Sequence, residues 1–270
     1  MKKGFVLIVV LWMMTIFAVL SASLAYRARI YLKLVKYQIA AFENLSCARE
    51  SLNYAVLTLI DDNYNYDERG DNWNSIDYEP ADSSDIRITV IDENRKVNIN
   101  TAADNLLAGL VHLDTELVKK IIENRPYLRI EELLCVEGIT NEIYYGREDL
   151  GIVGLKDLIT VYSNGKININ TAEGNVLKCI PSIDVTTVDI ILNYCAVDKF
   201  EQENALTQDL INLGVRPEIA SQIIGFLTVG SDVYKIEIEA VHKKYKMHNK
   251  IGVVINRAPK EIKIILWEER

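Results

Sequence analysis

The sequence has 270 residues, with 30 basic and 38 acidic side chains, a net charge of -8 at pH 7 and 49% hydrophobic residues. This composition is typical of a folded globular protein with one large or two small domains, and it excludes general disorder. The excess of acid also argues against sequence-independent nucleic-acid binding, which depends on an excess of Lys and Arg.

An uncharged stretch from Phe5 to Tyr26 follows a short basic stub. As a helix, this stretch would be about 33 Å long, which is enough to cross a hydrocarbon core of about 30 Å. We therefore predict a transmembrane helix at residues 5–26. A secretory signal peptide is an alternative, because Ser23-Leu24-Ala25 resembles a cleavage site. A third interpretation is a prepilin leader at residues 1–4, cut between Gly4 and Phe5.

Helical periodicity continues beyond the apolar stretch, through residues 27–60. No Gly lies between Gly4 and Gly70, and no Pro occurs before Pro80, so we predict one continuous amphipathic helix to about Ile60. Cleavage after Ala25 would divide this helix, which argues against the signal peptide. The predicted apolar stripe needs a covering β-sheet and consists of Ile30, Leu34, Tyr37, Ala41, Leu45, Ala48, Leu52, Ala55 and Leu59.

The N-terminal layout resembles that of the pilin and pseudopilin superfamily. The resemblance implies that prepilin peptidase cleaves between Gly4 and Phe5, with methylation, and that the body of the protein faces outward. Most members carry Glu at the fifth mature position, where it is thought to pair with the terminal ammonium of the subunit ahead. Here that position is Val9. Because an unpaired carboxylate in a bilayer is costly, Val9 predicts a subunit at a filament tip. The alternative is that Val9 is one more lipid-facing residue.

The charges beside the span predict the opposite orientation. By the positive-inside rule, the excess of cations after the span would place the body in the cytoplasm. The resemblance implies a single pass through the bacterial inner membrane with the body in the periplasm, and we adopt that orientation. The compared residues are Lys2 and Lys3 before the span and Arg27, Arg29, Lys33 and Lys36 after it.

Residues 61–85 form an acidic segment in which Arg69 is the single base among nine acids. Alternating oxygen-bearing side chains in this segment are typical of a calcium loop. However, Tyr66 stands where an EF-hand needs Gly, and Asn72 stands where it needs a bidentate Glu. A solvated acidic loop is therefore the simpler interpretation, although calcium remains a candidate cofactor with unknown ligands. The alternating residues are Asp61, Asn63, Asn65 and Asp67.

The middle of the chain is an internal repeat. Residues 97–102 (VNINTA) recur seventy positions later as residues 167–172 (ININTA). Each copy predicts a short strand, an Asn or Thr helix cap, and two helices around a tight turn. The repeated motif consists of Asn98, Asn100, Thr101 and Ala102 in the first copy and Asn168, Asn170, Thr171 and Ala172 in the second.

These units resemble helix-hairpin-helix motifs. In versions that bind nucleic acid, hairpin glycines let backbone N–H groups approach a phosphate. The hairpins at 111–114 and 181–184 lack glycine and end in Asp114 and Asp184, while Gly138 is preceded by Glu137. We therefore predict a structural or protein-binding platform that binds no nucleic acid.

The C-terminal segment 231–270 has the alternation of β-strands. Three runs, 234–240, 251–255 and 262–267, predict an antiparallel meander, which a strand at 86–91 would join. This sheet is the expected cover for the apolar stripe.

No catalytic chemistry is indicated. The three histidines, His112, His242 and His248, are not near a Ser or Cys nucleophile in sequence, and no phosphate-binding loop is present. We predict that the protein is not an enzyme. The four cysteines form no CxxC pair, which predicts buried free thiols, or one disulfide in an oxidising compartment. These cysteines are Cys47, Cys135, Cys179 and Cys195.

The whole pattern is similar to the minor pseudopilin K family of type II secretion. The similarity rests on the leader, Val9, the repeated Asn-Thr motif with its preceding segment 160–163 (TVYS), and the closing residues 266–268 (LWE). It implies an α+β fold in which a pilin-like long helix packs on an antiparallel sheet, with a large inserted α-domain of helix-hairpin-helix units. The expected divisions are a leader (1–4), a transmembrane helix (5–26), its amphipathic continuation (27–60), an acidic loop (61–85), a body strand (86–96), the helical insert (97–230) and C-terminal strands (231–270).

The implied function is that of a non-catalytic subunit at the tip of the secretion pseudopilus, which supports pseudopilus initiation and protein export across the outer membrane. The implied partners are the minor pseudopilins I and J, the pseudopilus shaft and prepilin peptidase. The alternative is a membrane-anchored helix-hairpin-helix receptor that binds DNA for uptake.

Overall fold

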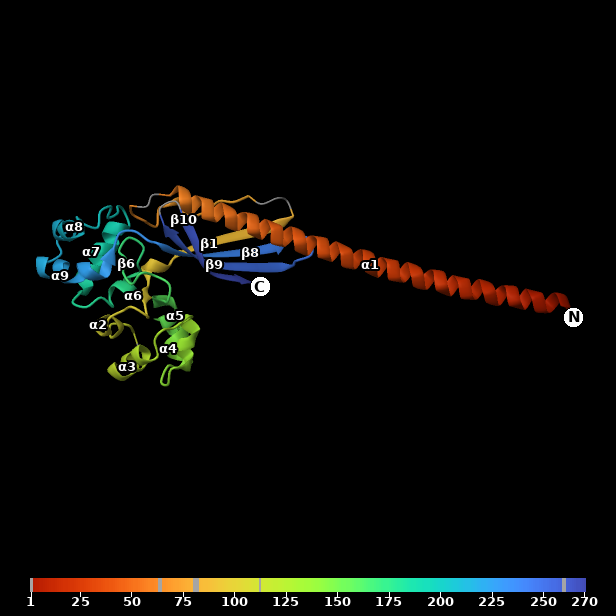
Figure 1. The fold of residues 1–270 in the computed structure, drawn as a ribbon, viewed down its shortest axis with the longest axis horizontal. Helices are drawn as coiled ribbons and strands as arrows, with labels where there is room; N and C mark the ends of the chain where they lie inside the picture. The colour runs from red at the N-terminus through yellow and green to blue at the C-terminus, as the bar shows by residue number, and fades with distance from the viewer. Residues whose placement is uncertain (1, 63–64, 80–82, 112, 259–260) are drawn as a thin grey trace.

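One helix accounts for almost a quarter of the chain and sets the length of the molecule. The structure, a computed structural model, describes residues 2–62, 65–79, 83–111, 113–258 and 261–270, so Asn63 and His112 lie outside the described residues. Helix α1 (Lys2–Asp61) is continuous over 60 residues, as predicted, which corresponds to about 90 Å. Its N-terminal half projects alone, away from the rest of the protein (Figure 1).

The C-terminal part of α1 lies across a four-stranded antiparallel sheet with the strand order β1-β8-β9-β10. These strands are β1 (Ser84–Asp92), β8 (Val233–His242), β9 (His248–Ala258) and β10 (Glu261–Glu269). The predicted meander and its fourth strand are therefore confirmed. The α1 side of the core includes Ala48, Leu52, Ala55 and Leu59.

The predicted stripe on α1 is covered only in part. Ala40 is buried, whereas Ile30, Leu34 and Tyr37 are 48%, 50% and 36% exposed. The sheet does not extend far enough toward the N-terminus to cover these three residues. The prediction that the sheet covers the stripe from Ile30 onward is therefore wrong for its first part.

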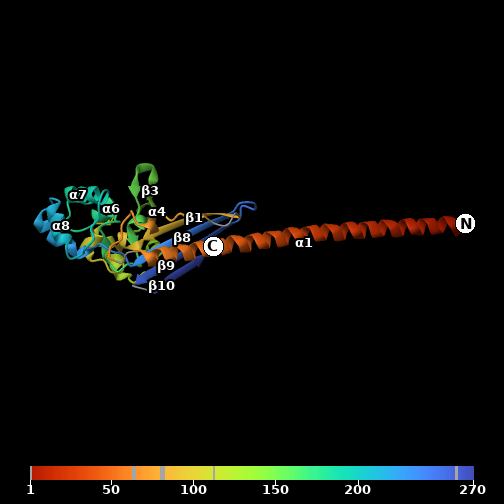
Figure 2. The ribbon, with the colours of Figure 1, turned by 90° about the horizontal axis from the view of Figure 1, so that it is seen from above.

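A helical region lies between β1 and β8 in sequence and gathers at the end of the sheet that points away from the N-terminus (Figures 1 and 2). A short 3-10 helix, η1 (Asn72–Asn74), precedes β1. The first half of the helical region contains η2 (Glu93–Arg95), β2 (Val97–Asn98), α2 (Asp104–Leu107), α3 (Thr115–Glu123), η3 (Ile130–Cys135), α4 (Asn141–Tyr145), β3 (Gly146–Arg147), η4 (Glu148–Leu150), β4 (Ile152–Val153), α5 (Leu155–Leu158) and β5 (Ile159–Thr160). Its second half comprises β6 (Ile167–Asn168), α6 (Gly174–Leu177), α7 (Val185–Cys195), α8 (Leu206–Asn212), α9 (Pro217–Ile223), η5 (Ile224–Phe226) and β7 (Leu227–Thr228).

The two sequence copies fold alike. In each, a two-residue strand carrying the first motif Asn pairs in parallel with a strand further on, β2 with β5 and β6 with β7. The predicted Asn or Thr helix cap is wrong, because α2 and α6 begin after Ala103 and Glu173, which provide no side-chain cap. The copies meet at equivalent positions, since a Cβ on Gly109 would lie 2.2 Å from the carbonyl oxygen of Cys179. Contact between equivalent positions is typical of an approximate two-fold axis.

The molecule has two separate hydrophobic cores. One lies between α1 and the sheet and includes Trp73, Tyr234 and Ile236. The other fills the helical region continuously from Val97 to Val229. All four cysteines are free thiols; Cys47 and Cys179 are buried as predicted, whereas Cys135 is exposed and Cys195 is half-buried. Because the two cores are distinct, whatever joins them fixes the position of the helical region relative to α1.

Candidate functional site

The exposed half of α1 is the first candidate functional surface. It is the one described helix that is long and apolar enough to cross a membrane, with a mean hydropathy of 2.7 in its most apolar window, none of which is buried. Phe5 is 71% exposed and Val9 is 40% exposed. Gly4 lies within the helix. The predicted cleavage position and Val9 therefore lie far from the folded body and remain accessible to a membrane, a peptidase or a neighbouring helix.

A buried polar network at the junction of the two cores is the second candidate site. Arg257 of β9 has a fully buried side chain, and its Nη2 lies 2.5 Å from Oδ1 of Asp67. The Tyr234 hydroxyl donates to the same oxygen, and the Ser231 backbone N–H donates to Oδ2 at 2.6 Å. The Arg257 guanidinium also lies 4.9 Å from the centre of the Tyr234 ring. Asp67, in the segment after α1, is thereby fixed to both β8 and β9.

Asp92 is the second carboxylate of this network and lies where β1 leads into the helical region. It accepts hydrogen bonds from Oγ1 of Thr171 at 2.5 Å and from Oγ of Ser231 at 2.7 Å. The amide of Asn168 is within 3.3 Å of Asp92 and 3.1 Å of the Asp67 carbonyl oxygen. The chain leaves the body at Asp92 and returns to it at Ser231, so both crossings are bound to the second copy of the motif.

The electrostatics of the junction follow from burial. Complete burial raises the pKa of Asp92 to about 6, against the opposing effect of its hydrogen bonds from Thr171 and Ser231. Burial also raises the pKa of Asp67, and the adjacent Arg257 guanidinium opposes that rise. The two carboxylates can be buried here because hydrogen bonds and one buried cation offset the free-energy cost of removing them from water.

The solvated acidic loop preferred from the sequence is wrong for Asp67, whose side chain is fully buried, and Asn63 of the alternating series lies outside the described residues. The carboxylates that come together, with oxygens within 4.8 Å of one another, are those of Asp62, Asp67 and Asp71. Asp67 is bound to Arg257, and Oδ2 of Asp71 accepts from the Glu68 N–H and from Nε1 of Trp73. A guanidinium beside the cluster repels a divalent cation, and these oxygens already have donors. The three carboxylates therefore do not fit a calcium ion, and calcium binding elsewhere stays a prediction.

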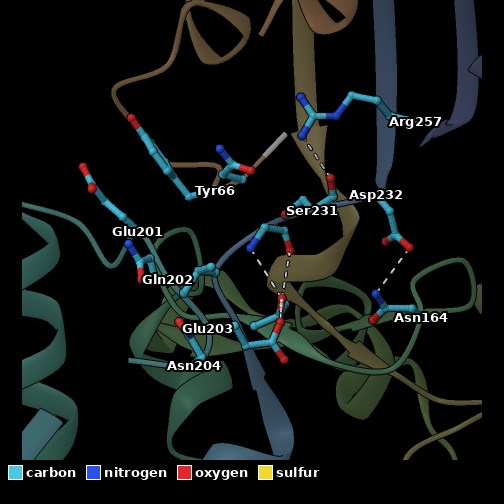
Figure 3. A pocket seen from close by; sticks show the side chains of 13 residues that line it. Tyr66, Asn164, Glu201, Gln202, Glu203, Asn204, Ser231, Asp232 and Arg257 are labelled. Carbon is cyan, nitrogen blue, oxygen red and sulfur yellow. Dashed lines mark hydrogen bonds between the residues drawn. The ribbon is translucent and has the colours of Figure 1, made fainter. Parts of the chain in front are cut away.

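A polar cleft of about 1040 Å³ opens beside the junction (Figure 3). Its walls include Tyr66, Glu201, Glu203, Asp232 and Arg257. On one side of the cleft, Asn164 donates to Asp232 at 3.3 Å (Figure 3). No hydrogen bond joins a histidine to a Ser, Thr or Cys side chain within the part of the chain that the structure describes.

The two motif copies have one identical role and one different role. Nδ2 of Asn100 donates to the Tyr127 carbonyl oxygen while its Oδ1 accepts from the Tyr127 N–H, both at 2.8 Å. Asn170 makes the same pair of bonds with Phe200, each at 2.9 Å. Asn98, in contrast, donates to the carbonyl oxygen of Ser163 within the helical region, whereas Asn168 lies in the junction. Of the other motif residues, Ala102 and Ala172 are buried, Thr101 is exposed, and Thr171 binds Asp92.

The two hairpin aspartates cap helices. Oδ1 of Asp114 accepts from the Leu117 N–H at 2.8 Å, and Oδ1 of Asp184 accepts from the Thr187 N–H at 2.7 Å. These amides at helix N-termini are the groups that would bind a phosphate. A carboxylate already occupies each site, and its charge would repel a nucleic-acid backbone.

Arg257, Tyr234 and Ser231 were not found by sequence reasoning. One signal could have indicated part of the junction: residues 160–163 (TVYS) occur again as 228–231 (TVGS), and 89–92 (TVID) is a more distant version. The final residues of these three segments, Asp92, Ser163 and Ser231, are the partners of the first motif Asn side chains.

Together, the fold and these surfaces define a class: a pilin-like α+β protein with a long exposed apolar helix and an added helical region. No family model and no curated protein sequence matches the chain. A chain in the crystal structure of the GspK-GspI-GspJ complex from the enterotoxigenic Escherichia coli type 2 secretion system matches with a TM-score of 0.64. That match has 16% sequence identity and covers 87% of this chain and 97% of that chain. The predicted resemblance and pilin-like α+β class are thus confirmed at the level of the fold.

Proposed function

We propose that this chain is a non-catalytic minor pseudopilin that assembles at the tip of a type II secretion pseudopilus. The observation that carries the proposal is the division of α1 into a fully exposed apolar half and a half that packs on the pilin-like sheet. Such a helix serves both as a membrane anchor and, after extraction, as a packing element between subunits. The fold match to a complex of three secretion proteins supports minor pseudopilins of types I and J as partners.

The finer parts of the proposal come from the sequence resemblance. Prepilin peptidase cleaves between Gly4 and Phe5, and the new terminus is methylated. The body lies on the periplasmic side of the inner membrane, the helix-hairpin-helix region is exposed at the tip, and the subunit contacts the pseudopilus shaft. Initiation of the pseudopilus then supports protein export across the outer membrane. Calcium binding, at a site other than the Asp62, Asp67 and Asp71 cluster, belongs to the same proposal.

The intact mass of the membrane-extracted protein tests the processing step. We expect the loss of residues 1–4 and the addition of one methyl group. A Phe5→Ala variant expressed beside it serves as a comparison for the cleavage efficiency. Retention of Met1 to Gly4, or a terminus at Tyr26, would contradict the pseudopilin assignment. Co-purification with neighbouring pilin-like subunits tests the partners.

The variant Val9→Glu tests the tip position. At a tip, no ammonium of a preceding subunit would neutralise the new carboxylate, and insertion should cost up to roughly 3 kcal/mol. We expect poorer pseudopilus initiation and secretion, with cleavage at Gly4 largely retained. Val9→Gln is the matched control, because the Gln side chain has the size of Glu without its charge. Better incorporation of Val9→Glu along the shaft would show that the subunit is internal.

A further inference from the structure

A cluster of cations lies where the exposed helix enters the folded body. Between residues 27 and 36, α1 carries four cations and no acid. The turn between β8 and β9 adds three lysines at positions 243, 244 and 246. Six of these cations make no ion pair within the described residues, whereas Lys243 lies 3.8 Å from Asp85. The six are Arg27, Arg29, Lys33, Lys36, Lys244 and Lys246.

The β8–β9 turn is held against α1 at a defined height. The rings of Tyr37 and Tyr245 lie 4.9 Å apart, and Tyr245 also contacts His242 at 5.2 Å. The buried amide of Asn44 donates to the Ala240 carbonyl oxygen at 3.1 Å and to Oδ1 of Asn249 at 2.8 Å. The turn therefore cannot move along the helix without breaking these contacts, and it points toward the N-terminal half of α1 (Figure 1).

The height of the turn above a bilayer follows from helix geometry, because α1 is unbroken. If Tyr26 marks the end of the hydrocarbon core, Tyr37 lies about 16 Å beyond it. The headgroup layer accounts for about 5 to 7 Å of this distance, and the Debye length adds about 10 Å at 0.1 M ionic strength. The lysines at the turn are thus within electrostatic reach of the surface, and a tilt of about 20° toward the sheet would bring them closer.

We propose that the β8–β9 turn and the cations of α1 at positions 27–36 form one docking surface for anionic phospholipid headgroups. This inference rests on the proposed function only in taking residues 5–26 as the membrane span. In the membrane-resident subunit, the surface tilts α1 toward the sheet and fixes the height of the body before assembly. It also gives a role to the cations whose excess on this side of the span opposes the positive-inside rule.

Fluorescence quenching in reconstituted vesicles tests the proposal. The full chain carries a fluorophore at His248→Cys in a Cys135→Ser background, because Cys135 is the exposed native thiol. Vesicles with a headgroup-attached quencher are made either from zwitterionic lipid alone or with anionic phospholipid added. We expect strong quenching only with anionic lipid at about 0.1 M ionic strength, and its loss at about 1 M, where the Debye length is about 3 Å.

The variant Lys244→Gln/Lys246→Gln should lower the ratio of docked to undocked protein by up to about 25-fold, because each surface cation contributes about fivefold. The matched control, Lys119→Gln/Lys178→Gln, makes the same charge change in the helical region and should leave quenching unaltered. Quenching that is equal in the two membranes, whether high or absent, would overturn the proposal, as would an equal effect of the control. A chain that fails to insert into either vesicle would instead overturn the membrane-anchor function itself.

Discussion

The two copies of the Asn-Thr motif share a sequence and a local fold but not a set of neighbours. In both, the Oδ1 of the first Asn accepts from the N–H two residues on, at 2.8 Å in Asn98 and 3.0 Å in Asn168. In both, the second Asn pairs with the backbone of a residue some thirty positions later. The difference lies in the remaining amide of the first Asn. That of Asn98 stays inside the helical region, whereas that of Asn168 reaches Asp67, Asp92 and Ser231.

This difference shows how a repeat unit is attached to the pilin-like sheet. The local hydrogen bonds that build the unit are kept in both copies, because an unpaired buried amide is costly. The copy next to the sheet adds a second layer of contacts, in which Asp92, Ser231 and Arg257 come from the pilin-like body. The second copy therefore attaches the helical region to the body through a buried network, whereas the first half of the region reaches the sheet through the half-exposed ion pair of Arg129 with Glu268 of β10, at 2.7 Å.

The largest effect is expected for removal of the buried cation. The variant Arg257→Ala leaves the Asp67 carboxylate buried without its charged partner, which typically costs about 3 to 5 kcal/mol. Chemical unfolding of the full chain in detergent micelles would measure this loss. Arg49→Ala is the control, because Arg49 pairs with Glu269 at 3.2 Å with 56% of its side chain exposed and should cost no more than about 1 kcal/mol. Equal losses in the two variants would show that the junction does not hold the two cores together.

The pH dependence of stability isolates the second buried carboxylate. The pKa of Asp92 is about 6 in the folded protein and near 3.8 when the chain is unfolded. Below about pH 3 the carboxyl is protonated in both states. Between about pH 3 and 6 the unfolded state loses its proton first, so the free energy of unfolding falls as pH rises. The fall amounts to about 3 kcal/mol and is complete above the folded pKa.

The variant Asp92→Asn cannot titrate and should lack this contribution. The difference in unfolding free energy between the native chain and Asp92→Asn, measured from pH 3 to pH 7, should therefore change by about 3 kcal/mol in favour of the variant. Asp149→Asn, at an exposed position where an Arg147 hydrogen bond lowers the pKa, is the comparison and should show no such trend. A difference that does not vary with pH would mean that Asp92 stays ionised throughout.

Local patterns were predictable from the sequence, and long-range contacts were not. The continuous helix followed from the absence of Gly and Pro, and the strands followed from alternation, because both depend on neighbouring residues. How much of α1 the sheet covers depends on the position of the β8–β9 turn along the helix. No pattern in the sequence of α1 predicts that position. The junction joins Asp67, Asp92 and Arg257 across as many as 190 positions. Their isolated polar side chains give no periodic signal, and the composition of the acidic segment around Asp67 instead favoured a solvated loop.

The smallest effect is a difference between paired Asn variants, and it tests the comparison of the copies directly. Asn100→Ala and Asn170→Ala each remove one donor and one acceptor to a backbone segment, so each should cost about 2 kcal/mol. Asn170 is buried and its Nδ2 also lies 3.3 Å from the Val229 carbonyl oxygen, whereas Asn100 is half-buried, so Asn170→Ala should cost up to about 1 kcal/mol more than Asn100→Ala.

Asn98→Ala and Asn168→Ala should differ, because only Asn168 donates into the junction. Removing the Asn168 amide leaves an Asp92 oxygen and the Asp67 carbonyl oxygen each with one donor fewer. We therefore expect Asn168→Ala to lower the free energy of unfolding by about 1 kcal/mol more than Asn98→Ala does. In an Asp92→Asn background the network has lost its charge, so this additional cost should shrink and reveal coupling between Asn168 and Asp92. Unfolding of the four single variants and the double variant would measure both differences. Equal costs at Asn98 and Asn168, with no coupling, would mean that the two copies are energetically equivalent and that the junction does not depend on the motif.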